Sequence, residues 1–245
     1  DKITESFPRH TAKKQETLVD GGNIDIVPEG EPAIFVFKTV ADPFVGKMSF
    51  FKVMNGSIRR DMTLRNNTTG DNEKLAHIYT VRGKKQTEVE ELACGDIGMV
   101  AKLNNTNTND TLTWNKAFEY RRIVFPKPYY VKGMTPASKG DEGKISQSIA
   151  KMVEEDYTLR FENNPETKQL LIYGLGEVHL AVLAARLKSR FGLNIKYDTP
   201  KIAYREKITK SVDVEGKHKK QNGGSGQYGH VKMRFAPGED EGLTF

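Results

Sequence analysis

Glycines near the C-terminal end of the chain are spaced as in a loop that binds a phosphate. Residues 224–229 read Gly-Ser-Gly-Gln-Tyr-Gly, which fits the G-x-G-x-x-G pattern of dinucleotide-binding turns. Such a turn must follow a strand and open a helix, because the helix N-terminus supplies the N–H groups that hold the pyrophosphate. Here basic residues precede the glycines, and residues 230–235 alternate polar and apolar side chains as a half-buried strand does. We therefore expect no dinucleotide site. Two interpretations remain open: a tight turn between strands, or a flexible basic loop that approaches a nucleic-acid backbone.

The positive charge of the chain gathers around this loop. The whole chain has a net charge of +6, and residues 201–234 alone contain nine Lys or Arg against three acids. A basic surface attracts phosphate backbones without reading their sequence. We therefore favour a polyanionic partner over a charged face that is only solvated.

Two other groups of reactive side chains could suggest catalysis. Glu177 and His179 lie two residues apart and so point to roughly opposite sides of a helix start, which we interpret as a helix cap plus an interface residue. Glu154, Glu155 and Asp156 form a contiguous acidic run after the last apolar residue of a predicted helix. We interpret this run as a solvated helix end rather than as paired catalytic carboxylates.

Nucleotide, metal and membrane signals are absent from the sequence. No G-x-x-x-x-G-K-[ST] segment occurs, and the five histidines lack metal-ligand spacing. Cys94 is the only cysteine, so we expect no internal disulfide, and we expect Cys94 itself to be a small buried residue. No apolar run of about 18 residues and no signal peptide are present. We therefore expect a cytoplasmic protein with no cofactor in this chain.

Hydrophobic periodicity predicts a multi-domain protein. Residues 1–29 are expected to be a lead-in or linker. Residues 30–114 contain short, regularly spaced strands with turn signals such as Asn55-Gly56, which is typical of a closed β-barrel. Residues 115–127 are expected to be a linker.

The next segment, residues 128–206, changes to an α+β pattern. Apolar residues fall on one face of a first helix at Ile145, Ile149 and Met152, and on a second at Leu180, Leu183, Leu187 and Phe191. With the strands between them, the order β-α-β-β-α-β predicts a ferredoxin-like domain. Residues 207–245 are expected to form strands around the glycine loop, as the N-terminal part of a truncated α+β domain.

Five segments, taken in order, resemble bacterial elongation factor G. They are FKTVADPFVGK at 37–47, ACGDIG at 93–98, GLGEVHL at 174–180, PKIAYRE at 200–206 and QNGGSGQYGHV at 221–231. The resemblance implies the β-barrel domain II, the ferredoxin-like domain III and the start of domain IV of a translational GTPase. It implies that the parent promotes GTP-dependent tRNA–mRNA translocation, and also ribosome recycling. GTP and Mg²⁺ are then expected for the parent's GTPase domain, while this chain itself is not an enzyme.

The resemblance also implies partners and site residues. The expected partners are the ribosome through its rRNA and proteins, the tRNA–mRNA of the decoding region, and the parent's own GTPase and fifth domains. Gly176, Glu177 and His179 are expected to make interdomain or ribosome contacts. The expected RNA-contact loop consists of Lys217, His218, Lys219, Lys220, Gly223, Gly224, Ser225, Gly226, Gln227, Tyr228, Gly229 and His230.

The loop departs from the commonest form of the family. Asn222 stands where that form has Ser or Thr, and Ser225 where it has Arg, which removes one phosphate contact. A divergent paralogue is therefore an open interpretation. Two alternative functions are a ribosome-protection GTPase of the tetracycline-resistance type and a stand-alone RNA-binding module.

Overall fold

A computed structural model describes residues 13–42, 45–83, 85–138, 140–204, 206–221 and 223–238. The chain divides into two compact units, Asp1–Lys201 and Ile202–Phe245. Pro43, Phe44, Arg205 and Asn222, which belong to the motifs above, lie outside the described residues, as do residues 239–245. In the described ranges, no helix is both long and apolar enough to cross a bilayer.

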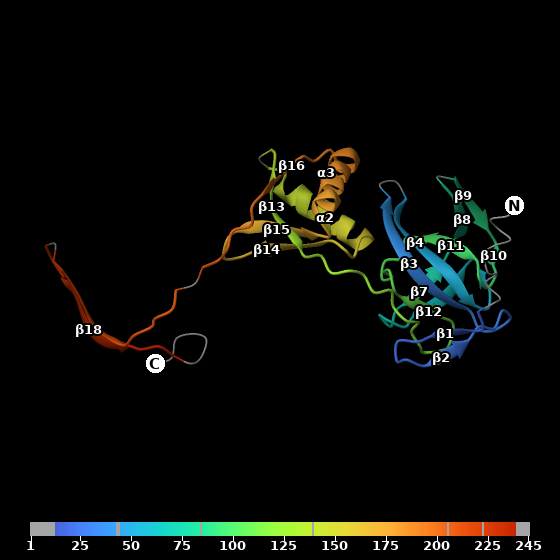
Figure 1. Ribbon diagram of the computed structural model, residues 1–245, viewed down its shortest axis with the longest axis horizontal. Coiled ribbons are helices and arrows are strands. Elements are labelled where there is room, and N and C mark those ends of the chain that lie inside the picture. Colours follow the sequence, from blue (N-terminus) through green and yellow to red (C-terminus); the bar gives the residue numbers. More distant parts are fainter. Residues whose placement is uncertain are drawn as a thin grey trace. The chain divides into compact units, whose positions relative to one another are not determined.

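The first unit begins with a curled eight-stranded sheet (Figure 1). Its order is β7-β6-β12-β3-β4-β11-β8-β9, and its adjacent strands run antiparallel. The bounds are β3 Ala33–Asp42, β4 Gly46–Asn55, β6 Met62–Asn66, β7 Asn72–Leu75, β8 Ile78–Arg82, β9 Lys85–Val89, β11 Ile97–Ala101 and β12 Thr111–Thr113. The short strands β5 (Ile58–Arg59) and β10 (Glu91–Leu92) pair separately. The β-barrel prediction is confirmed, in the form of a curled sheet that ends at β7 and β9 rather than a fully closed ring.

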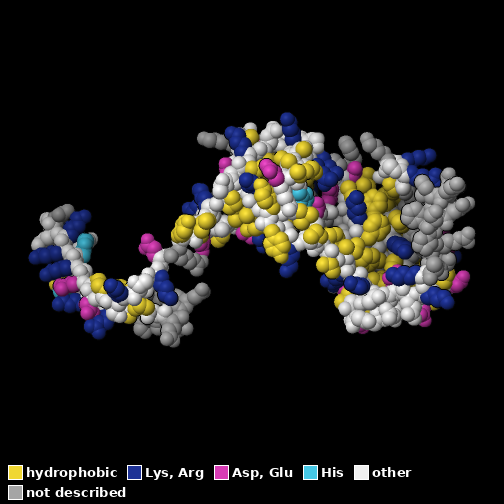
Figure 2. Space-filling view, in the orientation of Figure 1, with side chains coloured by type: hydrophobic (Ala, Val, Ile, Leu, Met, Phe, Trp, Pro, Cys, Tyr) yellow, Lys and Arg dark blue, Asp and Glu magenta, His cyan; other side chains and the backbone are white. Residues whose placement is uncertain are grey.

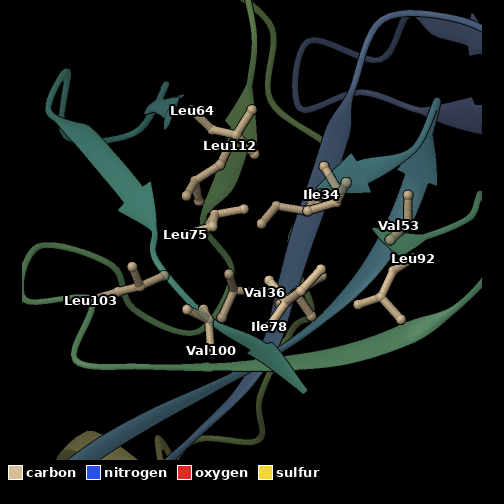
Figure 3. Close-up of a cluster of buried hydrophobic side chains, with 12 residues drawn as sticks. Ile34, Val36, Val53, Leu64, Leu75, Ile78, Leu92, Val100, Leu103 and Leu112 are labelled. Carbon is tan, nitrogen blue, oxygen red and sulfur yellow. The ribbon is translucent and has the colours of Figure 1, made fainter. Parts of the chain in front are cut away.

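The concave side of this sheet holds the barrel core (Figure 3). It is built from buried aliphatic side chains and one phenylalanine, which alternate along the strands with outward-facing residues. The cluster comprises Ile34, Val36, Phe51, Val53, Ile58, Leu64, Leu75, Ile78, Leu92, Val100, Leu103 and Leu112. Cys94 is buried, as expected, and burial raises the pKa of its thiol, so little reactive thiolate forms.

The lead-in contributes to a second apolar cluster of the barrel. Strands β1 (Gln15–Thr17) and β2 (Asn23–Asp25) form a small antiparallel pair. Leu18, just after β1, bridges to Tyr120 and packs with Ile24 against the cluster around Phe35 and Met54. The described part of the lead-in is therefore tied to the barrel.

The second half of this unit has the predicted β-α-β-β-α-β order (Figure 1). The elements are β13 Tyr130–Pro136, α2 Glu142–Glu155, β14 Arg160–Asn164, β15 Gln169–Gly174, α3 Glu177–Phe191 and β16 Ile195–Asp198. The sheet order β14-β15-β13-β16, with antiparallel neighbours throughout, is that of a ferredoxin-like domain. Its core is separate from that of the barrel and comprises Met134, Ile145, Ile149, Met152, Leu159, Ile172, Leu180, Leu183, Leu187 and Leu193. The helix-face prediction from the sequence is thus confirmed.

A buried glutamine fixes the path of the chain after β16. The side-chain amide of Gln169 donates to the carbonyl of Thr199 (3.2 Å) and accepts from the N–H of Lys201 (2.9 Å). Gly133, on the neighbouring strand, leaves room for it, since a Cβ there would collide with the Gln169 amide nitrogen. Gln169 therefore holds the segment that leads out of the first unit.

The second unit contains a long hairpin. β17 (Val212–Lys220) and β18 (Gln227–Phe235) pair antiparallel along their whole length, and almost every residue is exposed. The strands expected around the glycine loop are present.

A glycine in β11 gives a test of the barrel core. A Cβ at Gly98 would collide with Leu92 and would lie 2.6 Å from the buried ring of Phe51. We expect G98A to lower the free energy of unfolding by about 1–3 kcal/mol through overpacking, as measured by urea denaturation. The matched control is G143A in α2, where a Cβ meets nothing within 4 Å. It should leave stability unchanged or raise it slightly, and equal losses for the two variants would contradict this account of the core.

Candidate nucleic-acid interface

The glycine loop turns between two antiparallel strands. Gly223 and Gly224 have positive φ angles of 51° and 121°, which L side chains rarely adopt. A Cβ at either position would meet nothing within 4 Å. These glycines therefore serve the backbone conformation of the turn rather than close packing. As expected from the alternating side chains of residues 230–235, the strand β18 follows the loop. The loop therefore does not open the helix that a dinucleotide-binding turn requires.

The register of the hairpin gives it two different faces. Residues directly opposite each other in an antiparallel pair share a face, and residues two apart along a strand do so as well. We call the end of the hairpin at the glycine loop its tip and the opposite end its base. In the half near the base, one face is apolar and carries Val212, Val214, Val231, Met233 and Phe235. The opposite face carries mainly charged side chains.

The acids of the charged face lie near the base of the hairpin and are paired. Asp213 accepts two hydrogen bonds from the guanidinium of Arg234, at 2.8 and 3.0 Å. This contact raises the pKa of Arg234. Glu215 lies 2.5 Å from His230 Nε2 and 3.7 Å from Lys232 Nζ. The charges at the base of the hairpin therefore largely neutralise one another.

The tip of the hairpin is positive and lacks such compensation. No acid occurs between Gly216 and Phe235 in the sequence. Lys217 and Lys219 lie on the charged face, and Lys219 is directly opposite Tyr228. In the described part of the chain, Lys217, Lys219 and Lys220 make no ion pair. Figure 2 shows dark-blue lysine and arginine side chains along this hairpin.

The structure brings the predicted loop residues together but divides them between the two faces. Lys217, Lys219, Tyr228 and His230 share one face, and Tyr228 has 66% of its surface exposed. His218 and Lys220 share the other face, where His218 Nε2 lies 3.2 Å from the Gln227 amide oxygen. The sequence showed the cluster and its charge, whereas the division into faces required the strand register.

The predicted residues of the ferredoxin-like domain lie at the start of α3. Gly176 is the residue before the helix, and exposed Glu177 occupies its first turn, where negative charge suits the helix dipole. His179 points inward: its Nδ1 accepts the Leu175 N–H at 3.1 Å, and its Nε2 lies 3.1 Å from an Asp156 oxygen. A backbone N–H can only donate, so the proton is on Nε2 and is donated to Asp156. The imidazole thus ties the start of α3 to the end of α2, while the predicted interdomain or ribosome contacts of these residues remain a prediction.

The interpretation of the acidic run as a solvated helix end is wrong for two of its three residues. Of the three acids, only Glu154 is exposed, whereas Glu155 and Asp156 are half-buried. The side chain of Glu155 has only 10% of its surface exposed. Asp156 accepts hydrogen bonds from His179 and from both the N–H and the hydroxyl of Thr158. A local signal for Asp156 exists in the sequence, because an Asp two residues before a Thr is typical of an Asx turn.

These contacts determine the ionisation of Asp156. Burial by itself would raise the pKa of this carboxyl, but the hydrogen bonds from Thr158 and His179 outweigh that effect, and the net pKa is lowered. The carboxylate form is therefore the one that the fold stabilises.

The lowered pKa of Asp156 predicts a pH-dependent stability. A carboxyl group whose pKa is lower in the folded state than in the unfolded state stabilises the fold at pH values above the unfolded-state pKa, here 3.8. This contribution is lost as the pH falls through the pKa of the folded state. We therefore expect D156N to be less stable than the wild type at pH 6, with the difference shrinking below about pH 4. Denaturant unfolding of both proteins across this range measures it. A difference that does not depend on pH would contradict the assigned role of the carboxylate.

Comparison with known proteins agrees with this architecture. Three domain models match in consecutive order: elongation factor G domain 2 over residues 31–115, domain III over residues 125–199 and domain IV over residues 200–245. A crystal structure of a protein from Thermus thermophilus is 32% identical with a TM-score of 0.71, and the match covers 86% of this chain and 32% of that one. The chain thus spans about a third of the length of that structure. Because consecutive domains of a single family account for most of its length, the chain belongs to the elongation factor G family.

Proposed function

We propose that this chain is the RNA-contacting part of a ribosomal translocase, and that the β17–β18 hairpin tip meets RNA near the tRNA–mRNA. Membership of the elongation factor G family supports a role in translation. The observation that carries the proposal is the uncompensated lysine cluster at the tip, beside an exposed tyrosine. In this proposal, GTP and Mg²⁺ act at the GTPase domain of the complete factor, in the cytoplasm.

The geometry of the tip suits a nucleic-acid strand. Lysines that neutralise phosphates release counterions and supply affinity that is independent of sequence. An exposed aromatic ring beside them gives a stacking surface for an unpaired base. The glycine turn adds little side-chain bulk, so the backbone can approach a phosphate closely. Lys217, Lys219 and Tyr228 share one face and can therefore act on the same strand.

The paired base of the hairpin contributes in a different way. Asp213 and Glu215 hold Arg234, His230 and Lys232, so these cations are less available to a phosphate than the tip lysines are. The ion pairs also reach across the two strands. We infer that the base holds the two strands together while the tip binds.

Removing the two lysines of the charged face tests the proposal. We expect K217A/K219A to weaken binding of the chain to ribosomes and to single-stranded RNA. The slope of log affinity against log salt should fall in magnitude by about 0.7–0.9 for each phosphate that is no longer neutralised. The matched control is K151A/K188A, which removes the same charge from exposed positions on α2 and α3. Co-sedimentation and fluorescence anisotropy across a salt series measure both variants.

The control separates a local contact from a general charge effect. If the two double variants lose affinity equally, the hairpin is not the binding site. An unchanged salt slope in K217A/K219A would show that these lysines are only solvated. Placing K217A/K219A in the complete factor should slow translocation at saturating GTP, and full activity there would contradict the translocase proposal.

Tyr228 provides a second test, which is independent of charge. Loss of a stacked base costs about 1–3 kcal/mol of binding free energy. We therefore expect Y228A to weaken binding to single-stranded RNA by roughly 5- to 150-fold, while Y228F, which keeps the ring, binds nearly as the wild type does. Anisotropy titrations at fixed salt measure this. Equal losses for Y228A and Y228F would instead assign the contribution to the hydroxyl group.

A further inference from the structure

The C-terminal end of α2 meets the outer edge of β3, within the first unit. On one side β3 pairs with β4, and Ala41 lies opposite Lys47. The Lys47 carbonyl accepts the N–H of Lys102 and so faces away from β3. On its other side, β3 pairs with β12 only through Ala33–Phe35. The backbone groups of Val36 bond to Asp110 and Asn109, and the edge beyond Val36 presents backbone groups that need other partners.

Glu155 supplies the partner for one of these groups. Its Oε1 accepts the N–H of Ala41 at 2.7 Å. The same carboxylate binds Arg190, near the end of α3, with Nη1 at 2.9 Å from Oε1 and 3.0 Å from Oε2. One side chain on α2 therefore connects the barrel edge with both helices of the ferredoxin-like domain.

Neighbouring contacts make this a defined junction. The hydroxyl of Thr39 donates to the Glu154 carbonyl at 2.9 Å and lies 3.0 Å from the hydroxyl of Thr108. Thr39 and Thr108 are both buried, so the contact between their hydroxyls is shielded from water. Tyr157, just after α2, lies with its ring 5.3 Å from that of Phe125 in the connecting segment.

The negative charge of Glu155 is unfavourable at the end of α2 unless donors outside the helix meet it. The C-terminal end of a helix carries partial negative charge, and the last turn of α2 contains no basic residue to offset it. A carboxylate there needs donors from outside the helix. Arg190 and the Ala41 N–H supply them, and bonds to an ionised group are stronger than neutral ones. The end of α2 is therefore bound to β3 of the barrel through Ala41 and to α3 through Arg190.

We propose that the last turn of α2 is an electrostatic joint that fixes the ferredoxin-like domain on the barrel. The Glu155 carboxylate is its shared acceptor, held by β3 and α3 together. Removing this carboxylate frees the domain to reorient while both domains stay folded. The proposal does not depend on RNA binding by the hairpin.

The separate cores of the two domains distinguish a joint from a general stabilising contact. The barrel cluster and the ferredoxin-like cluster share no residue. Each domain therefore keeps its buried apolar surface when the junction opens. The expected loss of protection is confined to the β3 edge around Ala41.

Amide hydrogen exchange and ¹⁵N relaxation of the 245-residue chain test the proposal. We expect E155A to speed exchange at the Ala41 amide by about tenfold or more, since a hydrogen bond to a charged acceptor is lost. Amides in the two cores, at Phe51 and Ile172, should keep wild-type protection. The barrel and the ferredoxin-like domain should tumble with one correlation time in the wild type and with two in E155A.

The matched control is E154A, which removes the same charge from the adjacent, exposed residue and leaves its backbone carbonyl in place. It should behave as the wild type does. An unchanged exchange rate at the Ala41 amide in E155A would overturn the proposal. An equally faster rate in E154A would also overturn it. Loss of protection throughout both cores in E155A would also count against it. If E155A does not fold, E155Q is the variant to measure, because it keeps an acceptor oxygen but loses the charge. Exchange at the Ala41 amide should then rise by a few-fold. A wild-type exchange rate in E155Q would overturn the proposal.

Discussion

A carboxylate that leaves water must be met by a cation or by hydrogen-bond donors, and this requirement sorts the charges of the chain. Glu155 and Asp156 meet it through Arg190, His179 and backbone N–H groups, and so they belong to the fold. At the base of the hairpin, acids and bases pair across the strands. On the described part of the hairpin, the lysines at the tip make no ion pair, and they all have one sign. The part of the hairpin that is open to a partner is the part whose charges the fold does not use.

The sequence predicted the ferredoxin-like domain well because its signals are local. Helical periodicity at Ile145, Ile149 and Met152 marks a face that the sheet buries, and the structure places all three in the core. The hairpin was predicted for the same reason, since alternation and glycines act over a few residues. The way the barrel strands meet was less accessible. The order of its strands depends on pairings such as β12 with β3 and β6, which join segments far apart in the sequence.

The acidic run shows where local reasoning fails. Three acids after the last apolar residue of a helix normally face water, and apart from the Asx-turn signal at Asp156 nothing nearby in the sequence indicates otherwise. The Ala41 N–H that Glu155 accepts comes from a residue 114 positions earlier, and Arg190 from one 35 positions later. Helical spacing alone places His179 and Glu177 in different directions, and in the structure Glu177 is exposed while His179 bonds to the Leu175 N–H. The partner of His179, Asp156, lies 23 positions earlier at the end of the other helix, so the spacing within α3 does not indicate it.

The end of α2 also limits how this helix can change in length. Three successive positions serve different neighbours there: the Glu154 carbonyl meets the barrel, Glu155 meets the barrel and α3, and Asp156 meets His179. One inserted residue would rotate everything beyond it by about 100° and advance it by about 1.5 Å. That shift would turn Glu155 away from β3 and bring a different side chain to the edge. Exposed positions of α2 can therefore accept many substitutions. The number of residues between the first turn of α2 and Glu155, by contrast, is fixed by these contacts. The length of α2 thus determines which side chain meets the edge of the barrel.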